Sequence, residues 1–131
     1  MKSRQERNAI ERSLVAVVDD DESVRESLPD LLREFGFAAR AFSSAEEFLA
    51  SDSLDEARCL ILDIAMPGMT GFDLQRELKL CGHEIPIIFI TAQNDEGIRA
   101  RAFEEGAAEF LLKPFSDRAL LAALDTALRI N

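Results

Sequence analysis

The chain has 131 residues, of which 47% are hydrophobic and 31% are charged, and its formal net charge at pH 7 is −10. This length and apolar content predict one compact domain and exclude a disordered chain. The excess of acidic residues disfavours direct binding to nucleic acid or to an anionic membrane surface, because Lys and Arg neutralise phosphate groups. The longest apolar runs, such as residues 14–18 and 85–90, are too short to cross a bilayer.

The amino-terminal segment differs in composition from the remainder. Residues 1–13 are polar and basic, so we expect a flexible lead that precedes a domain over residues 14–131. This segment lacks the apolar stretch of a secretory signal. Cys59 and Cys81 have no metal-binding spacing, and Cys59 lies in an apolar run typical of a buried, reduced thiol. These features together predict a cytoplasmic protein.

Short apolar segments alternate with helical patterns five times along the chain. The β-branched and apolar runs predict strands at residues 14–18, 37–42, 59–62, 87–90 and 109–112. The first helix carries apolar residues at helical spacing up to Phe35 and ends at Gly36. A capping box of Ser44 and Glu47 opens a short helix that turns Phe48 and Leu49 inward.

The later helices are predicted at about residues 71–80 and 95–105, with Gly82 and Gly106 following them. Ser116 caps the last helix, and four leucines are expected on one buried stripe: Leu120, Leu121, Leu124 and Leu128. Strands that alternate with single helices predict a doubly wound α/β domain, in which a parallel sheet of five strands is covered on both faces.

Polar residues follow four of the five predicted strands, at the edge where ligands bind in an open parallel sheet. They are Asp19, Asp20, Asp21 and Glu22 after the first strand, Asp63 after the third, Thr91 after the fourth and Lys113 after the fifth. Clustered carboxylates repel one another, and a bound cation or a raised pKa relieves this. Oxygen ligands favour a hard ion such as Mg²⁺. Asp63 then acts as a nucleophile toward phosphorus, with Lys113 and Thr91 contacting the phosphoryl oxygens.

Each of these residues also has an ordinary structural explanation. Asp21 and Glu22 are expected to be the N-cap and a first-turn acid of the helix that follows. Asp63, Thr91 and Lys113, taken singly, are a turn residue, a strand-end hydroxyl and a surface charge. Their joint placement after different strands favours a phosphoryl-transfer site.

The residues at these strand ends resemble the receiver domain of bacterial two-component response regulators over about residues 14–129. The matching segments are residues 17–25, 62–71, 89–92 and 110–115. The Asp-x-x-Met-Pro-Gly-Met-x-Gly sequence from Asp63 and the Lys-Pro-Phe sequence from Lys113 are specific in combination. Residues 23–28 and 110–115 are similar to the FixJ-type branch of this family. The resemblance implies a flavodoxin-like (CheY-like) strand order, 2-1-3-4-5.

The same resemblance implies the function of the acidic cluster. Asp63 would accept a phosphoryl group from the phosphohistidine of a sensor histidine kinase or a phosphotransfer protein. Asp20, Asp63 and the main-chain carbonyl of Ala65 would bind Mg²⁺ directly, and Asp19 would act through a water molecule. Such a domain is a signalling module that catalyses only its own phosphorylation and dephosphorylation, and is not an enzyme in the usual sense.

The resemblance also implies a conformational switch. Lys113 would pair with the phosphoryl oxygens, and its bond to Pro114 would be cis. Thr91 would turn toward the phosphoryl group, and Phe110 would fill the vacated space from outside. The surface of the fourth helix, fifth strand and fifth helix would change as a result, with a homodimer on this surface as one expected outcome.

Three other functions share parts of this pattern. A phosphatase of the haloacid dehalogenase type also has Asp-x-Asp after its first strand, but it needs Thr or Val where Ser23 stands. A flavodoxin-like FMN-binding protein needs a hydroxyl-rich phosphate loop, and three aspartates repel phosphate. A pure interaction module would not use its acids. The output, either a stand-alone receiver or one that precedes an effector domain, stays open.

Overall fold

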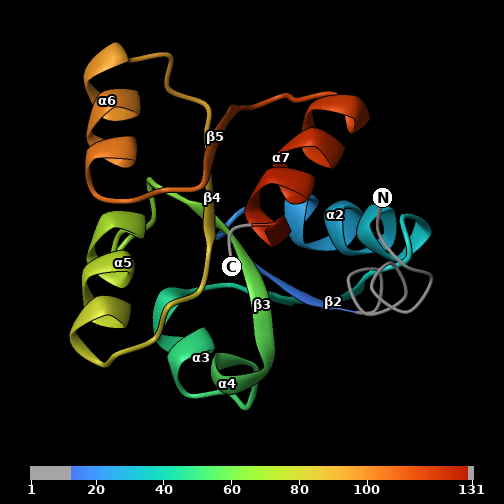
Figure 1. Ribbon diagram of the computed structural model, residues 1–131, viewed down its shortest axis with the longest axis horizontal. Helices are drawn as coiled ribbons and strands as arrows, with labels where there is room; N and C mark the ends of the chain where they lie inside the picture. Colours follow the sequence, from blue (N-terminus) through green and yellow to red (C-terminus); the bar gives the residue numbers. More distant parts are fainter. Residues whose placement is uncertain (1–12, 130–131) are drawn as a thin grey trace.

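The computed structural model describes residues 13–129, so the lead expected at residues 1–13 lies outside the described residues apart from Ser13. Five strands alternate with six helices over this range (Figure 1). In chain order they are β1 (Leu14–Val18), α2 (Glu22–Glu34), β2 (Ala38–Phe42), α3 (Ala45–Leu49), α4 (Ser53–Glu56), β3 (Ala57–Asp63), α5 (Gly71–Leu80), β4 (Ile87–Thr91), α6 (Glu96–Glu104), β5 (Glu109–Leu112) and α7 (Asp117–Arg129). The predicted fourth and fifth helices are therefore α6 and α7.

The five strands form one parallel sheet in the order β2-β1-β3-β4-β5, which confirms the predicted fold and strand order. The chain passes from β1 outward to β2 and then returns across β1 to β3. The direction of winding reverses between β1 and β3, so the carboxyl ends of these two strands flank the switch point where such sheets bind ligands.

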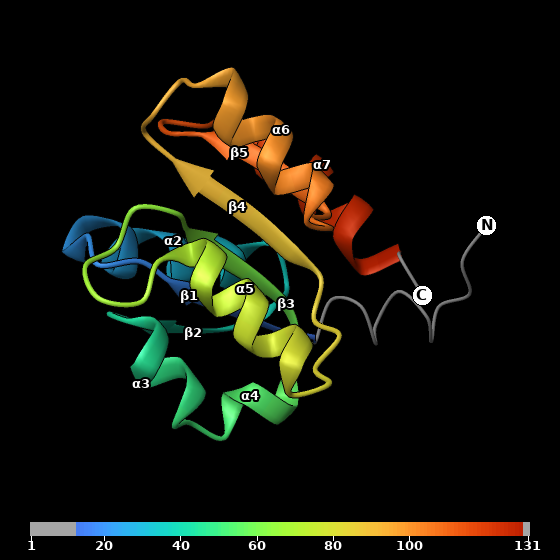
Figure 2. The ribbon, with the colours of Figure 1, turned by 90° about the vertical axis from the view of Figure 1, so that its left-hand side faces the viewer.

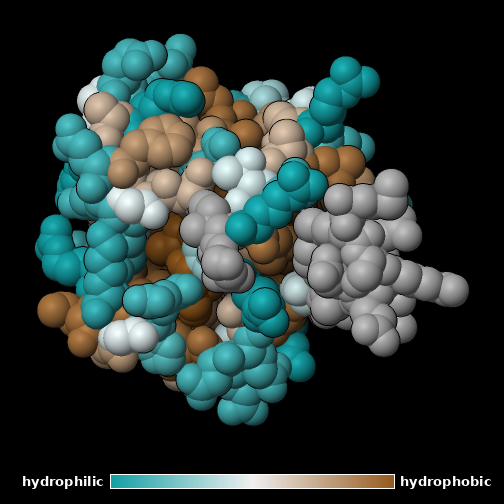
Figure 3. Space-filling model, in the orientation of Figure 1, coloured by the Kyte–Doolittle hydropathy of each residue, from teal (hydrophilic) through white to brown (hydrophobic). Residues whose placement is uncertain are grey.

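Two helical layers cover the sheet, with α2 and α7 on one face and α3, α5 and α6 on the other (Figures 1 and 2). The side chains of β1 alternate between these layers because successive residues of a strand point to opposite faces. Val15 and Val17 pack with α2 and α7, whereas Ala16 and Val18 pack with the opposite layer. On the face shown in Figure 3, hydrophilic side chains cover much of the described surface, and apolar side chains show between them.

The last helix shows where the predicted apolar stripe was wrong. Leu120 and Leu124 are buried, but Leu121 is 43% exposed. The buried positions are completed by Ala123 and Ala127, which continue the spacing of three and four residues from Leu120. Leu121 lies beside this stripe, and the small alanines allow α7 to pack closely on the sheet.

The short helices also differ from the prediction. The helix α4 was not predicted, and β3 begins two residues earlier than expected. Ser44 caps α3 by accepting a hydrogen bond from the Glu47 N–H at 3.1 Å. The Glu47 carboxylate, however, accepts from the Ser43 N–H and hydroxyl rather than from Ser44. The complete capping box belongs to α5, between Thr70 and Asp73.

The described helices include none that is both long enough and apolar enough to cross a membrane. Cys59 is fully buried in β3 as a free thiol, as predicted, and Cys81 is free and exposed.

Candidate phosphoryl-acceptor site

The parallel sheet brings the predicted polar residues to a single edge. Asp63 and Thr91 are the last residues of β3 and β4, and Asp19 and Lys113 directly follow β1 and β5. The strand pairing extends one residue into each loop, because the Asp19 N–H donates to the Phe42 carbonyl at 3.1 Å. The Lys113 N–H donates to the Thr91 carbonyl at 2.8 Å. These main-chain bonds fix where each functional side chain leaves the sheet.

Three carboxylates meet at this edge. Asp19, Asp20 and Asp63 each offer an oxygen atom, and these oxygens lie within 4.8 Å of one another. Asp19 and Asp63 are buried, with 0% and 5% of their surface exposed, whereas Asp20 is open to solvent. An all-oxygen donor set of this kind, with one side left open, fits a hard divalent cation such as Mg²⁺.

The Lys113 side chain reaches into the cluster from the loop after β5. Its ammonium lies 2.7 Å from Asp19 Oδ2 and 3.8 Å from Asp63 Oδ1. Burial of Lys113 disfavours its charge, but the hydrogen bond to Asp19 and the negative charge of Asp63 outweigh this and raise the pKa of the ammonium. The site therefore keeps one fixed positive charge next to its buried carboxylates.

The carboxyl group of Asp63 is strongly perturbed. Burial is the largest cause, and the nearby charge of Asp19 adds to it, so that the pKa of Asp63 is raised to about 7. Lys113 and a hydrogen bond from the Ala65 N–H act in the opposite direction without cancelling the effect. A perturbed carboxyl group beside other charged groups in a cleft is typical of a functional site.

Asp19 is more fully paired than its neighbours. Its Oδ1 accepts a hydrogen bond from the Asp21 N–H at 2.9 Å, and its Oδ2 accepts from Lys113. The Arg25 guanidinium also donates to the Asp19 carbonyl at 3.1 Å, a contact that the sequence analysis did not anticipate. As predicted, Asp21 is the N-cap of α2, and Glu22 is the acid of its first turn.

Thr91 and Phe110 lie deeper beside the cluster. Thr91 is 1% exposed, and its hydroxyl oxygen accepts a hydrogen bond from the Gln93 N–H at 3.1 Å. Phe110 is 5% exposed and packs in the core, and its expected movement on phosphorylation stays a prediction. The peptide bond between Lys113 and Pro114 is cis.

Gly71 holds the start of α5 against the end of β3. Its N–H donates to the Ile64 carbonyl at 3.0 Å. A Cβ atom at Gly71 would lie 2.6 Å from the Asp63 carbonyl oxygen and 2.9 Å from the Ile64 Cα, so any side chain here would force α5 or the loop after β3 to shift. Gly71 belongs to the motif noted in the sequence, but its spacing alone does not reveal this close approach.

The sequence matches the family model for the response regulator receiver domain over residues 15–125. It is 42% identical over 118 residues to the response regulator protein TodT of Pseudomonas putida strain F1, covering 90% of this chain and 52% of TodT. It is 40% identical over 114 residues to the transcriptional regulatory protein FixJ of Azorhizobium caulinodans, covering 87% of this chain and 54% of FixJ.

The fold is also similar to solved structures of this kind. The structure described as FixJ-N superposes with a TM-score of 0.81 at 37% identity, covering 91% of this chain and 95% of that one. The chain spans about half the length of the curated relatives it matches. The matching relatives agree with the FixJ-type likeness seen in the sequence. With its acidic cluster, lysine and strand order placed as described, the chain belongs to the response regulator receiver domain family.

Proposed function

We propose that Asp63 accepts a phosphoryl group from the phosphohistidine of a sensor histidine kinase or a phosphotransfer protein, in a Mg²⁺-dependent reaction. The observation that carries this proposal is the meeting of Asp19, Asp20 and Asp63 within 4.8 Å, with the Lys113 ammonium beside them. The proposal places the protein in the bacterial cytoplasm, a compartment that keeps the free thiol of Cys59 reduced.

The reaction is a displacement at phosphorus. An Asp63 carboxylate oxygen attacks, a new O–P bond forms, and the P–N bond to the donor imidazole breaks. The electron pair of the broken bond returns to the imidazole nitrogen. Lys113 is close enough to turn from Asp19 toward the phosphoryl oxygens, and the Thr91 hydroxyl hydrogen is available to donate to one of them.

The carboxylates explain why a divalent cation is needed. An anionic phosphoryl donor would otherwise meet two buried acids and one exposed acid, for which Lys113 provides the only ion pairs among the described residues. Asp20 and Asp63, with the Ala65 carbonyl, would hold Mg²⁺, and Asp19 would act through water because both of its carboxylate oxygens already accept hydrogen bonds. When bound, Mg²⁺ supplies positive charge to the phosphoryl oxygens.

The partner surface is proposed next to the site. A groove of about 690 Å³ lies between α2 and the loop after β5, and Asp21 and Lys113 border it at the acidic cluster. Most of its wall is apolar, with Val24, Leu28 and Leu31 on one side and Pro114 and Phe115 on the other. A donor that brings phosphohistidine to Asp63 must cover this neighbouring surface, so we place the kinase or phosphotransfer protein here.

The output surface is proposed on α6, β5 and α7. Phe103, Leu112 and Leu121 expose 39%, 38% and 43% of their surface there. We propose that phosphorylation changes this surface, through Thr91 and Phe110, to control a partner or an effector domain, with a homodimer as one form of output. The domain's acidic charge argues against direct contact with nucleic acid.

Phosphotransfer from a small P–N donor tests this proposal. Phosphoramidate and Mg²⁺ are expected to give one phosphoryl group per chain, lost on incubation at alkaline pH as expected for an acyl phosphate. The same reaction with Asp63→Asn is expected to give no adduct. Rapid multiple turnover of phosphomonoesters would instead indicate a phosphatase and would contradict the proposal.

A further inference from the structure

The helix α6 is held in place differently at its two ends. Ala102 is the only buried residue of α6, a helix that lies wholly within the described residues. The amino end follows the loop after Thr91, beside the acidic cluster, and the carboxyl end leads to β5 from the opposite edge of the sheet. Since so little of α6 is buried, the polar contacts at its two ends decide how firmly each end is attached.

The carboxyl end of α6 is attached to α5 at three points. The Arg101 guanidinium lies 4.1 Å from the centre of the Phe72 ring. Gln75 Nε2 donates a hydrogen bond to the Glu105 carbonyl at 2.9 Å, and Lys79 Nζ donates to the same oxygen. Glu105 is the C-cap of α6, so these bonds use a carbonyl that the helix itself leaves unpaired.

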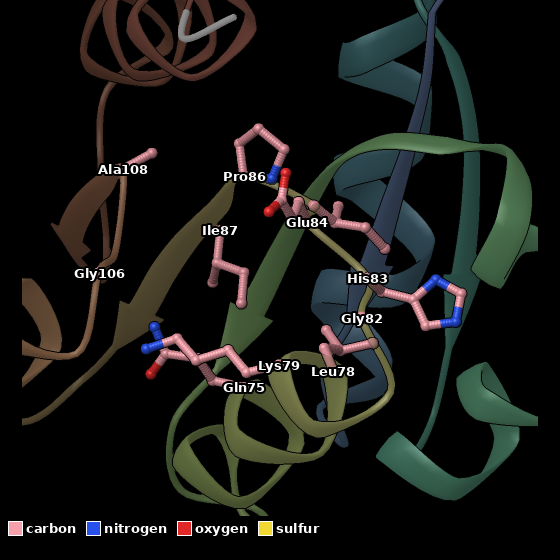
Figure 4. Close-up of a pocket in the computed structure, with 11 residues that line it drawn as sticks. Gln75, Leu78, Lys79, Gly82, His83, Glu84, Pro86, Ile87, Gly106 and Ala108 are labelled. Atoms are coloured by element: carbon pink, nitrogen blue, oxygen red, sulfur yellow. The ribbon is translucent and has the colours of Figure 1, made fainter.

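Figure 4 shows the two donors from α5. The side chains of Gln75 and Lys79 extend beside a pocket of about 420 Å³ toward the segment that contains Gly106. At the amino end of α6, Ile98 packs partly buried against the core, and the Arg99 guanidinium lies 5.7 Å from the centre of the Phe110 ring, but no hydrogen bond like those of Glu105 ties this end to α5 in the described part of the chain. The Asp95 cap of this end comes from the same segment of chain.

The amide of Gln75 is buried at a cost. Gln75 is 3% exposed, and its Oε1 is a buried atom without a hydrogen-bond partner in the described part of the chain. The Glu105 carbonyl only accepts, so the amide nitrogen must face it and the oxygen must point away. A leucine would fill similar space without burying an unpaired oxygen, so the benefit of glutamine here is its bond to Glu105.

We propose that Gln75, assisted by Lys79, is a positioning residue that fixes the carboxyl end of α6 on α5 while the amino end responds to phosphorylation. Phosphorylation next to Thr91 then moves α6 about its attachment to Gln75 instead of displacing the whole helix. This inference rests on the proposed function for the motion of the amino end. The attachment itself is present without a phosphoryl group.

The double variant Gln75→Leu/Lys79→Met tests this inference, with Arg76→Met as the control. Arg76 lies on the same helix and is exposed, and no contact with Glu105 involves it. Hydrogen exchange measured by NMR follows three amides whose bonds define the two ends: Arg99 at the amino end, and Glu105 and Ala107 at the carboxyl end. In the unphosphorylated double variant, Glu105 and Ala107 are expected to exchange about 10-fold faster or more, because local opening becomes easier.

In the Arg76→Met control, all three amides are expected to exchange at wild-type rates. In the unphosphorylated double variant, the Arg99 amide is also expected to exchange at the wild-type rate. After phosphorylation with Mg²⁺, Arg99 is expected to exchange faster in the wild type while Glu105 and Ala107 stay protected; in the double variant all three are expected to exchange faster. Unchanged protection of Glu105 and Ala107 in the double variant would overturn the inference. Absence of a phosphoryl adduct by intact mass would count against the proposed function alone, since the unphosphorylated comparison still tests the attachment.

Discussion

The Lys113 ammonium is hydrogen-bonded to Asp19 at 2.7 Å and stands 3.8 Å from Asp63, the residue that we propose to be phosphorylated. Lys113 is thus bound to Asp19 and lies within reach of Asp63, the proposed phosphoryl acceptor. A phosphoryl group on Asp63 would bring more negative charge to Lys113 than Asp19 does, and would draw the lysine away from its present partner. Such an exchange of partners would couple chemistry at Asp63 to the loop that follows β5.

Replacement of Lys113 should separate phosphorylation from its consequences. Lys113→Ala is expected to accept a phosphoryl group, at a lower rate, because Asp63 and the carboxylates proposed to bind Mg²⁺ remain. Amide chemical shifts of α6, β5 and α7 are expected to change much less on phosphorylation than in the wild type. Arg118→Ala, an exposed charge on α7, serves as the control. A full wild-type shift pattern in Lys113→Ala would show that the lysine does not couple the two events.

The raised pKa of Asp63 predicts the pH dependence of stability without Mg²⁺. Its pKa is about 7 in the folded protein against 3.8 in the unfolded chain, so the folded state binds the proton more tightly. Stability is therefore expected to fall as pH rises from about 4 to about 7. At pH 8, Asp63→Asn is expected to be more stable than the wild type by about 1–2 kcal/mol after allowance for solvent screening. Urea unfolding between pH 4 and pH 8 measures this difference.

Asp73 provides a control of opposite sign. Hydrogen bonds from the Thr70 N–H and hydroxyl lower the pKa of Asp73, so its contribution to stability is present above the unfolded pKa and is lost as pH falls through the folded one. Asp73→Asn is expected to be less stable than the wild type at pH 7, with the difference shrinking in acid. Identical pH profiles for Asp63→Asn and Asp73→Asn would contradict both assignments.

Asp20 is the carboxylate of the cluster that is open to solvent. Asp20→Asn is expected to weaken Mg²⁺ binding at least about 10-fold, because an anionic ligand is lost from a site with few protein ligands. The increase in melting temperature with Mg²⁺ concentration measures the affinity, since an ion that binds only the folded state stabilises it. Asp21→Asn is the control: Asp21 caps α2 and should not change the Mg²⁺ response. An unaltered response in Asp20→Asn would remove Asp20 from the metal site.

Gly71→Ala tests the close approach of α5 to the acceptor loop. The added methyl group would lie 2.6 Å from the Asp63 carbonyl oxygen, and must push the helix or the loop away. We expect a loss of about 1–3 kcal/mol in unfolding free energy and slower phosphorylation, because Asp63 leaves its position. Gly97→Ala on α6 is the control, since the nearest atom to its added methyl is the side-chain oxygen of Asp95, 3.1 Å away. Equal effects of the two substitutions would argue against a specific role for Gly71.

The sequence was sufficient for the sheet and for the residues at its edge. The apolar runs and the glycines after the helices predicted the sheet. The rule that ligands bind at strand ends predicted that Asp19, Asp63, Thr91 and Lys113 meet at one edge, and the family resemblance implied the strand order. Contacts with the main chain were not predictable. Gln75 binds the main-chain carbonyl of Glu105, and Gly71 lies against the main-chain carbonyl of Asp63. Every residue has such a carbonyl, so the sequence does not show which one is contacted, and only the packing of α5 determines it. Leu121 was misassigned because alanines fill the stripe as well as leucines do.

The most direct test of the account is the intact mass of the protein after incubation with acetyl phosphate. The wild type with Mg²⁺ is expected to gain one phosphoryl group, and the adduct should be absent without Mg²⁺ and absent in Asp63→Asn. Mass is a suitable readout because the chain has no Trp or Tyr and therefore little intrinsic fluorescence. An adduct of equal yield in Asp63→Asn, or none in the wild type under any condition, would contradict the assignment of Asp63 as the phosphoryl acceptor.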